Sequence, residues 1–317
     1  MGFDWTYKQK NSFSGSIGYD EFGNNGHGYT NQLQQIQNGI GEIISVVSSL
    51  NKSGNSFRFR TIDASLNYKR NFTKEDQGLE IGINSSFGNN HIVANNDQYL
   101  MPVDSLYYGR QNTNPGTSHE TEINIDYIQP VAKDVVLGVG SKLTLMNISS
   151  TSDVLSLQPD AKVYVQDSFL SNYLDYKQQV YAAYAEISFP VSNWFDTKIG
   201  SRYERTEINS YYSNAQSHAG TPGYNTFVPS IFFSKKLTDG QTIKLSYSKR
   251  IQRPDYRSLN PFINTSDPKN ITAGNPYLQP EKSTVASVRR RAIRPAPTTA
   301  SSARCSSCSA RPTSAWR

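Results

Sequence analysis

Apolar and polar residues alternate along most of this chain. In the stretch TIKLSYS at 242–248, the apolar residues Ile243, Leu245 and Tyr247 share one face of a strand and polar residues occupy the other. This period of two predicts β-strands with one apolar and one wet face. Ten such stretches lie near 3–7, 13–19, 62–72, 79–87, 123–127, 135–145, 181–189, 195–203, 227–233 and 243–247. An eleventh begins at STVASV, 283–288.

The connections between these stretches alternate in length. Short polar turns are predicted at 10–12, 73–77, 132–134, 191–194 and 237–241. Long links are predicted near 20–56, 88–118, 148–177, 206–226 and 249–282. A soluble β-sandwich has connections of about 4–6 residues at the median, so links of this length count against it. An outer-membrane barrel has short periplasmic turns, long extracellular loops and strands of about 9–11 residues.

Aromatic residues gather beside the short turns, where an outer-membrane barrel has its interfacial girdle. These residues are Tyr7, Phe13, Phe72, Tyr127, Phe189, Trp194, Phe195 and Phe233. The sequence therefore predicts an all-β fold, an antiparallel transmembrane β-barrel of which this chain holds about 10–11 strands. Low mean hydropathy agrees with a barrel that has a polar lumen face. In the first long link, Leu33 to Leu50 also shows helical spacing, so a short amphipathic helix and the top of a strand both remain open there.

The formal net charge of +6 belongs to the end of the chain. Residues 289–317 contain seven arginines and no acidic residue, which leaves 25 basic against 26 acidic residues in 1–288. No nucleic-acid partner is therefore expected. The composition changes in the middle of a strand pattern, so we interpret 289–317 as a disordered tail that arises from a shifted reading frame, with 1–288 as the barrel portion. The alternative is a real, disordered basic extension. Cys305 and Cys308 lie in this tail and receive no functional role.

Residues that carry chemistry elsewhere in proteins are scattered here. His27, His91, His119 and His218 show no metal-ligand spacing, and no nucleophile or phosphate-binding motif is present. The sequence thus predicts neither an enzyme nor a cofactor or metal site. Carboxylates on strands are expected to face a wet lumen, although an outer-membrane protease or lipase site stays an alternative for them; they are Glu122, Asp126 and Glu186. Tyrosines near the long links are either ordinary solvated residues or a ligand surface; they are Tyr107, Tyr108, Tyr211, Tyr212 and Tyr256.

The link 249–282 is rich in proline and carries a recognisable motif. It reads YSKRIQRP at 247–254, LNPF at 259–262 and GNPYLQPE at 274–281. Prolines fix φ and remove a backbone donor, so this link cannot join the sheet as an extra strand. The motif residues are Tyr247, Ser248, Arg253, Pro254, Leu259, Asn260, Pro261, Phe262, Gly274, Asn275, Pro276, Leu278, Pro280 and Glu281. A shorter string, GSRYERT at 200–206, adds Gly200, Arg202, Tyr203 and Glu204.

These strings resemble those of TonB-dependent receptors, closest to the group described as outer membrane β-barrel family proteins. The resemblance implies a barrel of about twenty-two strands in outer-membrane lipid, with a plug domain in its lumen and an energy-coupling TonB protein as partner. It implies uptake of a scarce solute such as a metal chelate, vitamin, glycan or peptide. This chain shows about half of those strands and neither plug nor coupling segment, so we expect it to be an internal piece of a larger receptor. The alternatives are a plugless porin or structural barrel, a barrel enzyme, and a secreted β-sandwich binding module.

Overall fold

The computed structural model describes residues 1–192, 195–213, 217–218, 223–237, 241–260, 272–275 and 277–292. Its strands are β1 Gly2–Tyr7, β2 Asn11–Gln37, β3 Ile43–Asn71, β4 Gly78–Met101, β5 Ser105–Ala132, β6 Val135–Gln158, β7 Val163–Gln166, β8 Asn172–Val191, β9 Phe195–Tyr212, β10 Ser217–His218, β11 Tyr224–Lys236, β12 Gln241–Gln252 and β13 Glu281–Ala292. One short helix, α1, spans Tyr256–Leu259. None of the helical residues described forms a segment long and apolar enough to cross a membrane.

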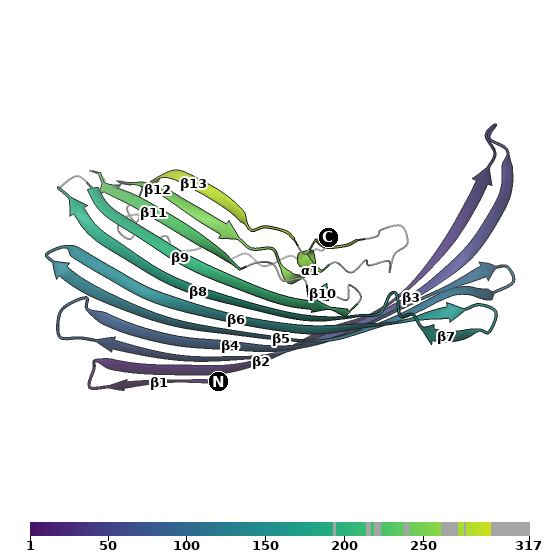
Figure 1. Cartoon of the computed structure of the whole chain (residues 1–317), viewed down its shortest axis with the longest axis horizontal. Helices are drawn as coiled ribbons and strands as arrows, with labels where there is room; N and C mark the ends of the chain where they lie inside the picture. Colours follow the sequence, from purple (N-terminus) through teal and green to yellow (C-terminus); the bar gives the residue numbers. More distant parts are fainter. Residues whose placement is uncertain are drawn as a thin grey trace, which may run out of the picture.

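All of the strands described belong to one antiparallel sheet. Eleven of them follow chain order from β1 to β13, while β7 pairs with β6 and β10 with β9. The sheet is open and strongly curved, with β1 and β13 at its two edges (Figure 1). The predicted antiparallel barrel class is confirmed, and the β-sandwich alternative is wrong because a sandwich needs two packed sheets.

The strands are much longer than predicted. β2 has 27 residues and β3 has 29, about three times the length that crosses a membrane. The predicted links 20–56 and 88–118 are therefore mostly paired strand, with tight turns near 38–42 and 102–104. Hydrophobic alternation does not predict these parts because the period of two breaks there: GNNGHG at 23–28 is polar on both faces, and the apolar residues of IISVVSSL at 43–50 do not alternate. The backbone ladder nevertheless continues from Gly23 opposite Arg58 to Gln35 opposite Val46. The helix alternative for Leu33 to Leu50 is wrong, because these residues lie at the end of β2, in the turn at 38–42 and at the start of β3.

The apolar face of the sheet points outward. Neighbouring strands present Ile83, Ile123, Leu143 and Tyr181 at one level, because these residues are in direct register. Exposed apolar residues continue this band across the sheet, including Ile17 at 56% and Phe227 at 60% exposure. Such a band on one face is the lipid-facing surface of an outer-membrane barrel.

Aromatic rings mark the end of the sheet where the short turns lie. Trp5 stacks on Phe13 at 5.5 Å between ring centroids, and Phe13 lies 4.7 Å from Tyr68. Toward the other edge of the sheet, on β9 and β11, the ring centroids of Phe195 and Phe233 are 6.4 Å apart. These contacts agree with the predicted girdle beside the short turns, and short turns are the periplasmic connections of an outer-membrane barrel. Trp194, which was part of that prediction, lies outside the described residues.

The last strand continues past the predicted boundary at Val288. β13 pairs with β12 as far as Ala292 opposite Gln241, so four residues of the predicted tail belong to the sheet. The Arg290 guanidinium donates to the side-chain oxygen of Gln241 at 2.6 Å. Residues 293–317, including both cysteines, lie outside the described residues, and the division of the chain at 288 stays a prediction.

Candidate functional site on the concave face

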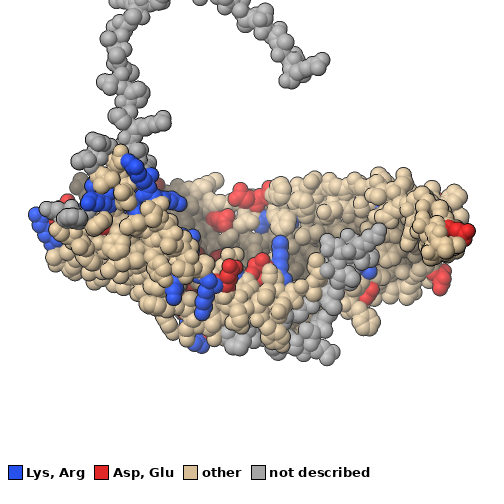
Figure 2. All heavy atoms as spheres, turned by 90° about the horizontal axis from the view of Figure 1, so that it is seen from above, with Lys and Arg blue, Asp and Glu red and all other residues tan. Residues whose placement is uncertain are grey.

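The concave face of the sheet carries four of the eight ion pairs between described residues, including every pair that involves Glu204. Figure 2 shows the space-filled molecule hollowed along its middle, with acidic and basic side chains along the hollow. Lys142 pairs with Glu122 at 2.6 Å, and Lys198 with Glu186 at 2.6 Å. All four residues alternate with the apolar residues of the outward face. In a closed barrel this concave face lines the lumen, where charged residues are solvated.

The three strand carboxylates that were candidate catalytic residues therefore have structural partners. Glu122 and Glu186 are ion-paired with lysines, and Asp126 accepts a hydrogen bond from the Tyr184 hydroxyl at 2.5 Å. They face the lumen side as expected.

The link between β12 and β13 folds inward over the concave face of β8 and β9 (Figure 1). We call its described part, residues 253–260, 272–275 and 277–280, the inward segment. Leu259, only 2% exposed, packs on Leu174, Tyr176, Ile208 and Tyr212 in the main buried apolar cluster. The Tyr212 hydroxyl donates to the carbonyl oxygen of Leu259 at 3.3 Å. Prolines keep this link out of the sheet but do not determine on which side of the sheet it lies. Burial of Leu259 against β8 and β9 places it on the inner side.

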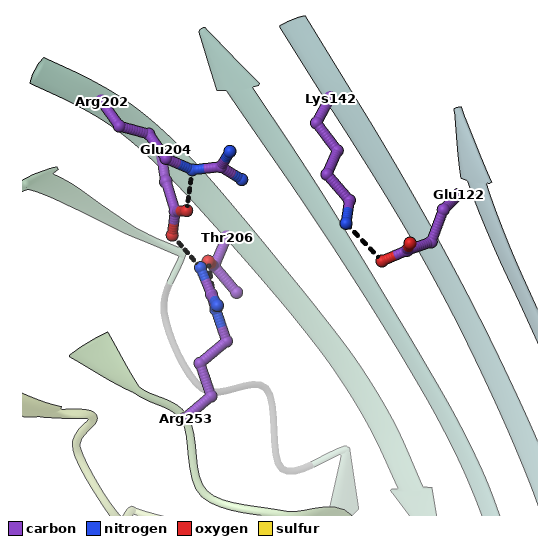
Figure 3. A network of polar contacts seen from close by, with 6 residues as sticks. All are labelled: Glu122, Lys142, Arg202, Glu204, Thr206 and Arg253. Atoms are coloured by element: carbon purple, nitrogen blue, oxygen red, sulfur yellow. Dashed lines mark hydrogen bonds and ion pairs between the residues drawn. The ribbon is translucent and has the colours of Figure 1, made fainter. Parts of the chain in front are cut away.

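Two of the motif strings meet in one ion-pair cluster, shown in Figure 3. Glu204, whose side chain is 7% exposed, accepts from Arg202 Nε at 2.5 Å and also pairs with the guanidinium of Arg253. Arg253 Nε donates to Thr206 Oγ1 at 3.2 Å. A carboxylate shared by two guanidinium groups satisfies a buried charge by charge-assisted hydrogen bonds. GSRYERT and the RP of the long motif are thus one structural unit, although 49 residues separate Glu204 from Arg253.

This cluster is connected to the middle of the sheet. The Arg202 guanidinium lies 5.3 Å from the centroid of the Tyr184 ring, and Tyr184 reaches Asp126 on β5. Asp126 in turn accepts from the Asn124 amide at 3.0 Å. A polar network therefore runs across the inner face from β5 to the inward segment.

Helix α1 begins with a side-chain cap. The Asp255 carboxylate accepts from the backbone N–H groups of Arg257 at 2.8 Å and Ser258 at 2.9 Å. The hydrogen bond from Ser258, followed by that from Arg257, lowers the pKa of Asp255 below its ordinary value. Asp255 therefore keeps its negative charge, and the cap, at neutral pH.

A close backbone approach closes the inward segment on itself. Gly274 N–H donates to the carbonyl oxygen of Asn260, and Asn275 N–H donates to that of Ser258, both at 2.8 Å. A Cβ on Gly274 would lie 2.5 Å from each of those two oxygens. The glycine of GNP is therefore required by this contact between backbones. Asn275 makes the following turn, since its side-chain oxygen accepts from Tyr277 N–H at 3.0 Å.

We expect Gly274→Ala to open this contact. The added methyl group meets carbonyl oxygens rather than flexible side chains, so the inward segment loses about 1–3 kcal/mol of local stability. Hydrogen exchange of the Gly274 and Asn275 region, measured by mass spectrometry on the full-length protein in detergent, should become faster. Gly26→Ala on β2 is the matched control, because nothing lies within 4 Å of its added Cβ. Unchanged exchange in Gly274→Ala would show that the contact is not formed.

The remaining motif residues have other places. Tyr203 and Tyr247 lie on the outward face, at 51% and 38% exposure. Glu281 begins β13 opposite Gln252, and Pro280 precedes it. Pro261, Phe262 and Pro276 lie outside the described residues. The motif thus divides into residues that hold the inward segment and residues that belong to the barrel wall; a functional role for each stays a prediction.

A cavity of about 880 Å³ lies between the inward segment and the halves of β4, β5, β6 and β8 that are farther from the short turns. Of the five tyrosines considered as a ligand surface, Tyr256 lines it. Tyr212 is buried in the apolar cluster, whereas Tyr107 and Tyr211 are exposed at 40% and 36%. The sequence does not single out the asparagines and serines that form most of the polar wall, because they lie on strand extensions for which the pattern predicts long links.

The histidines do not gather. Within the described ranges no group of three His, Cys, Asp or Glu residues is placed to hold a metal ion. His119 stacks on Phe87 at 4.2 Å on the outward face and contacts the Thr121 hydroxyl at 3.0 Å. The side chain of His218 lies outside what the structure describes.

The fold is that of an outer-membrane barrel wall, and the sequence match agrees. The model of the outer membrane protein beta-barrel family matches residues 94–289, more than half of the chain. The chain belongs to this family and is an outer-membrane protein. No curated protein sequence matches it.

Solved structures with a similar fold are transporters and uptake receptors. The ferric citrate transporter FecA is 11% identical, with 92% of this chain and 48% of that chain covered and a TM-score of 0.42. The copper transporter OprC is 9% identical, with 90% and 47% covered and a TM-score of 0.44. The ferric yersiniabactin uptake receptor FyuA from Yersinia pestis is 12% identical, with 92% and 49% covered and a TM-score of 0.38. The chain spans about half the length of these proteins, and its assignment rests on the family match.

Proposed function

We propose that this chain is the barrel portion of a TonB-dependent outer-membrane receptor that takes up a scarce solute. The observation that carries the proposal is the inward segment, which Glu204 holds inside the curve of the sheet, where it lines a polar cavity. A plugless porin needs an open aqueous channel, whereas this segment narrows the lumen side. Family membership and the resemblance of the long motif to receptor barrels support the same reading.

The proposed mechanism assigns capture of the solute to the cavity and adjoining hairpins. A plug domain and an energy-coupling segment would belong to other parts of a longer receptor, in keeping with the half-length coverage of the solved transporters. Energy delivered through TonB would displace the plug and release the solute to the periplasm. The chain itself supplies barrel wall and binding surface.

The test is uptake by cells that carry or lack the full-length gene, each with and without functional TonB. Cells are grown on limiting ferric chelates, vitamins, glycans or peptides, and accumulation of the labelled solute is measured. We expect accumulation of one solute class that needs both the gene and TonB. Uptake that persists without TonB would indicate a porin, and hydrolysis of the solute at the cell surface would indicate an enzyme.

A further inference from the structure

The polar wall of the cavity consists largely of amide and hydroxyl side chains. They come from four strands and from the inward segment, and they are Asn90, Asn112, Asn114, Ser150, Ser152, Asn172, Ser258, Asn260, Thr272 and Asn275. An amide carries two donors and an acceptor, and a hydroxyl both donates and accepts. This wall is therefore suited to a ligand that itself has many groups of mixed donor and acceptor character.

Hydrogen bonds within the wall orient several of these amides. The side-chain oxygen of Asn112 accepts from Ser152 Oγ at 3.2 Å, and that of Asn172 accepts from Ser213 Oγ at 3.3 Å. Their NH₂ groups are thereby directed away from these partners. Asn114 has the opposite orientation, because its NH₂ group donates to the Thr151 carbonyl oxygen at 3.4 Å. Donors and acceptors in fixed directions distinguish a polyhydroxylated ligand from one that offers only acceptors.

The charges of the lining have one sign. Arg110 and Arg257 line the cavity, and the lining residues that the structure describes include no Asp or Glu. Tyr256 supplies an aromatic ring beside Arg257, whose guanidinium lies 5.6 Å from the ring centroid. Guanidinium groups bind carboxylates in two-pronged geometry, and a tyrosine ring offers a flat surface with a polar edge.

We propose that the cavity binds an acidic oligosaccharide, a short chain of sugars that carry carboxylate groups. This inference deepens the proposed function and rests on it, since it takes the cavity as the receptor's solute site. Sugar hydroxyls match the amide wall, the carboxylates match Arg110 and Arg257, and a sugar ring packs on Tyr256. A volume of about 880 Å³ lies within the range of small-molecule sites, which is about 300–1,000 Å³. An anionic metal chelate would use the two arginines but would leave the amide wall without partners.

The experiment is titration calorimetry on the full-length receptor in detergent. The probes are trigalacturonate, its fully methyl-esterified neutral form and ferric citrate. We expect the receptor to bind trigalacturonate more tightly than the neutral form and to show no heat with ferric citrate. Binding of ferric citrate alone, or of none of the probes, overturns the inference.

Variants of neighbouring residues on opposite faces locate the site. Asn90→Asp places a negative charge in the cavity, and Arg257→Gln removes a positive one; each is expected to weaken trigalacturonate binding about tenfold at low salt. Asn89→Asp is the matched control, because Asn89 is exposed on the other face of β4 and does not line the cavity. An equal loss in Asn89→Asp and Asn90→Asp overturns the site, and so does unchanged binding in Asn90→Asp. Barrel folding of each variant is checked by its heat-dependent mobility in gels.

The inference and the proposed function fail in different ways. If the cells show TonB-dependent uptake of a solute other than an acidic glycan, the ligand class is wrong and the receptor assignment stands. If trigalacturonate binds as expected but its uptake proceeds without TonB, the ligand class stands and the receptor assignment is wrong.

Discussion

Replacing Glu204 with glutamine is expected to release the inward segment from the concave face. The carboxylate is 7% exposed and is shared by Arg202 and Arg253, whose side chains are 32% and 24% exposed. Removing its charge leaves two partly buried guanidinium groups without their counter-ion. Breaking a buried ion pair in this way costs about 3–5 kcal/mol. The backbone ladder of β9 does not depend on this side chain, so we expect the cost to fall on the segment and the sheet to persist.

Limited proteolysis of the full-length protein in outer membranes measures this release. Trypsin does not cleave the bond between Arg253 and Pro254, so the informative site is the bond after Arg257 in α1. Cleavage there should become faster in Glu204→Gln, while the heat-dependent gel mobility of the barrel stays that of the parent.

A control lies three residues further along the same strand. Glu207 pairs with Arg205 at 2.8 Å, and their side chains are 46% and 51% exposed on the outward face. Exposed pairs contribute about 0–1 kcal/mol, so Glu207→Gln should leave cleavage after Arg257 unchanged. If Glu204→Gln resists trypsin as well as the parent does, the ion-pair cluster does not hold the segment.

An arginine on the outward face of β6 is expected to impair barrel assembly. Leu143 lies in the apolar band between Ile123 and Tyr181. A charged arginine on the lipid face costs about 2–4 kcal/mol near the bilayer midplane and less toward the interfaces. We therefore expect Leu143→Arg to reduce the folded fraction of the full-length protein when it is folded into lipid vesicles at a series of denaturant concentrations.

The neighbouring residue provides the test of which face meets lipid. Thr144 points to the concave side, directly opposite Glu122 on β5. Thr144→Arg places the same side chain beside a carboxylate on the lumen side, so folding should stay close to that of the parent. Equal losses in the two variants, or a larger loss in Thr144→Arg, would contradict the assignment of the faces.

Strand number and face polarity were predictable because they depend on local alternation. The eleven predicted strands correspond to the eleven that follow one another along the sheet. The extensions of β2 to β5 were not predictable in this way. Polar runs and apolar residues follow one another there without a regular period of two, so the pattern that marks a half-buried strand is missing.

The candidate site was only partly predictable. The sequence singled out Arg202, Glu204 and Arg253 as motif residues, but their contact depends on a long link that turns inward. Gly274 was recognised within GNP, whereas its reason, a contact with the carbonyl oxygens of Asn260 and Ser258, appears only in the folded segment. Asparagines of the cavity such as Asn90 and Asn112 gave no signal, since a solvated loop and a ligand site use the same residue types.

By itself, the sequence determined the class of the protein: period-two patterning sets which face meets lipid, and prolines keep the link between β12 and β13 out of the sheet. The tertiary structure decided where that link lies and what it encloses. The reason is that alternation depends on residues two apart on one strand. The burial of Leu259 and the ion pair of Glu204 depend on contacts between segments about 50 residues apart in the chain. Only the curvature of the sheet brings those segments together.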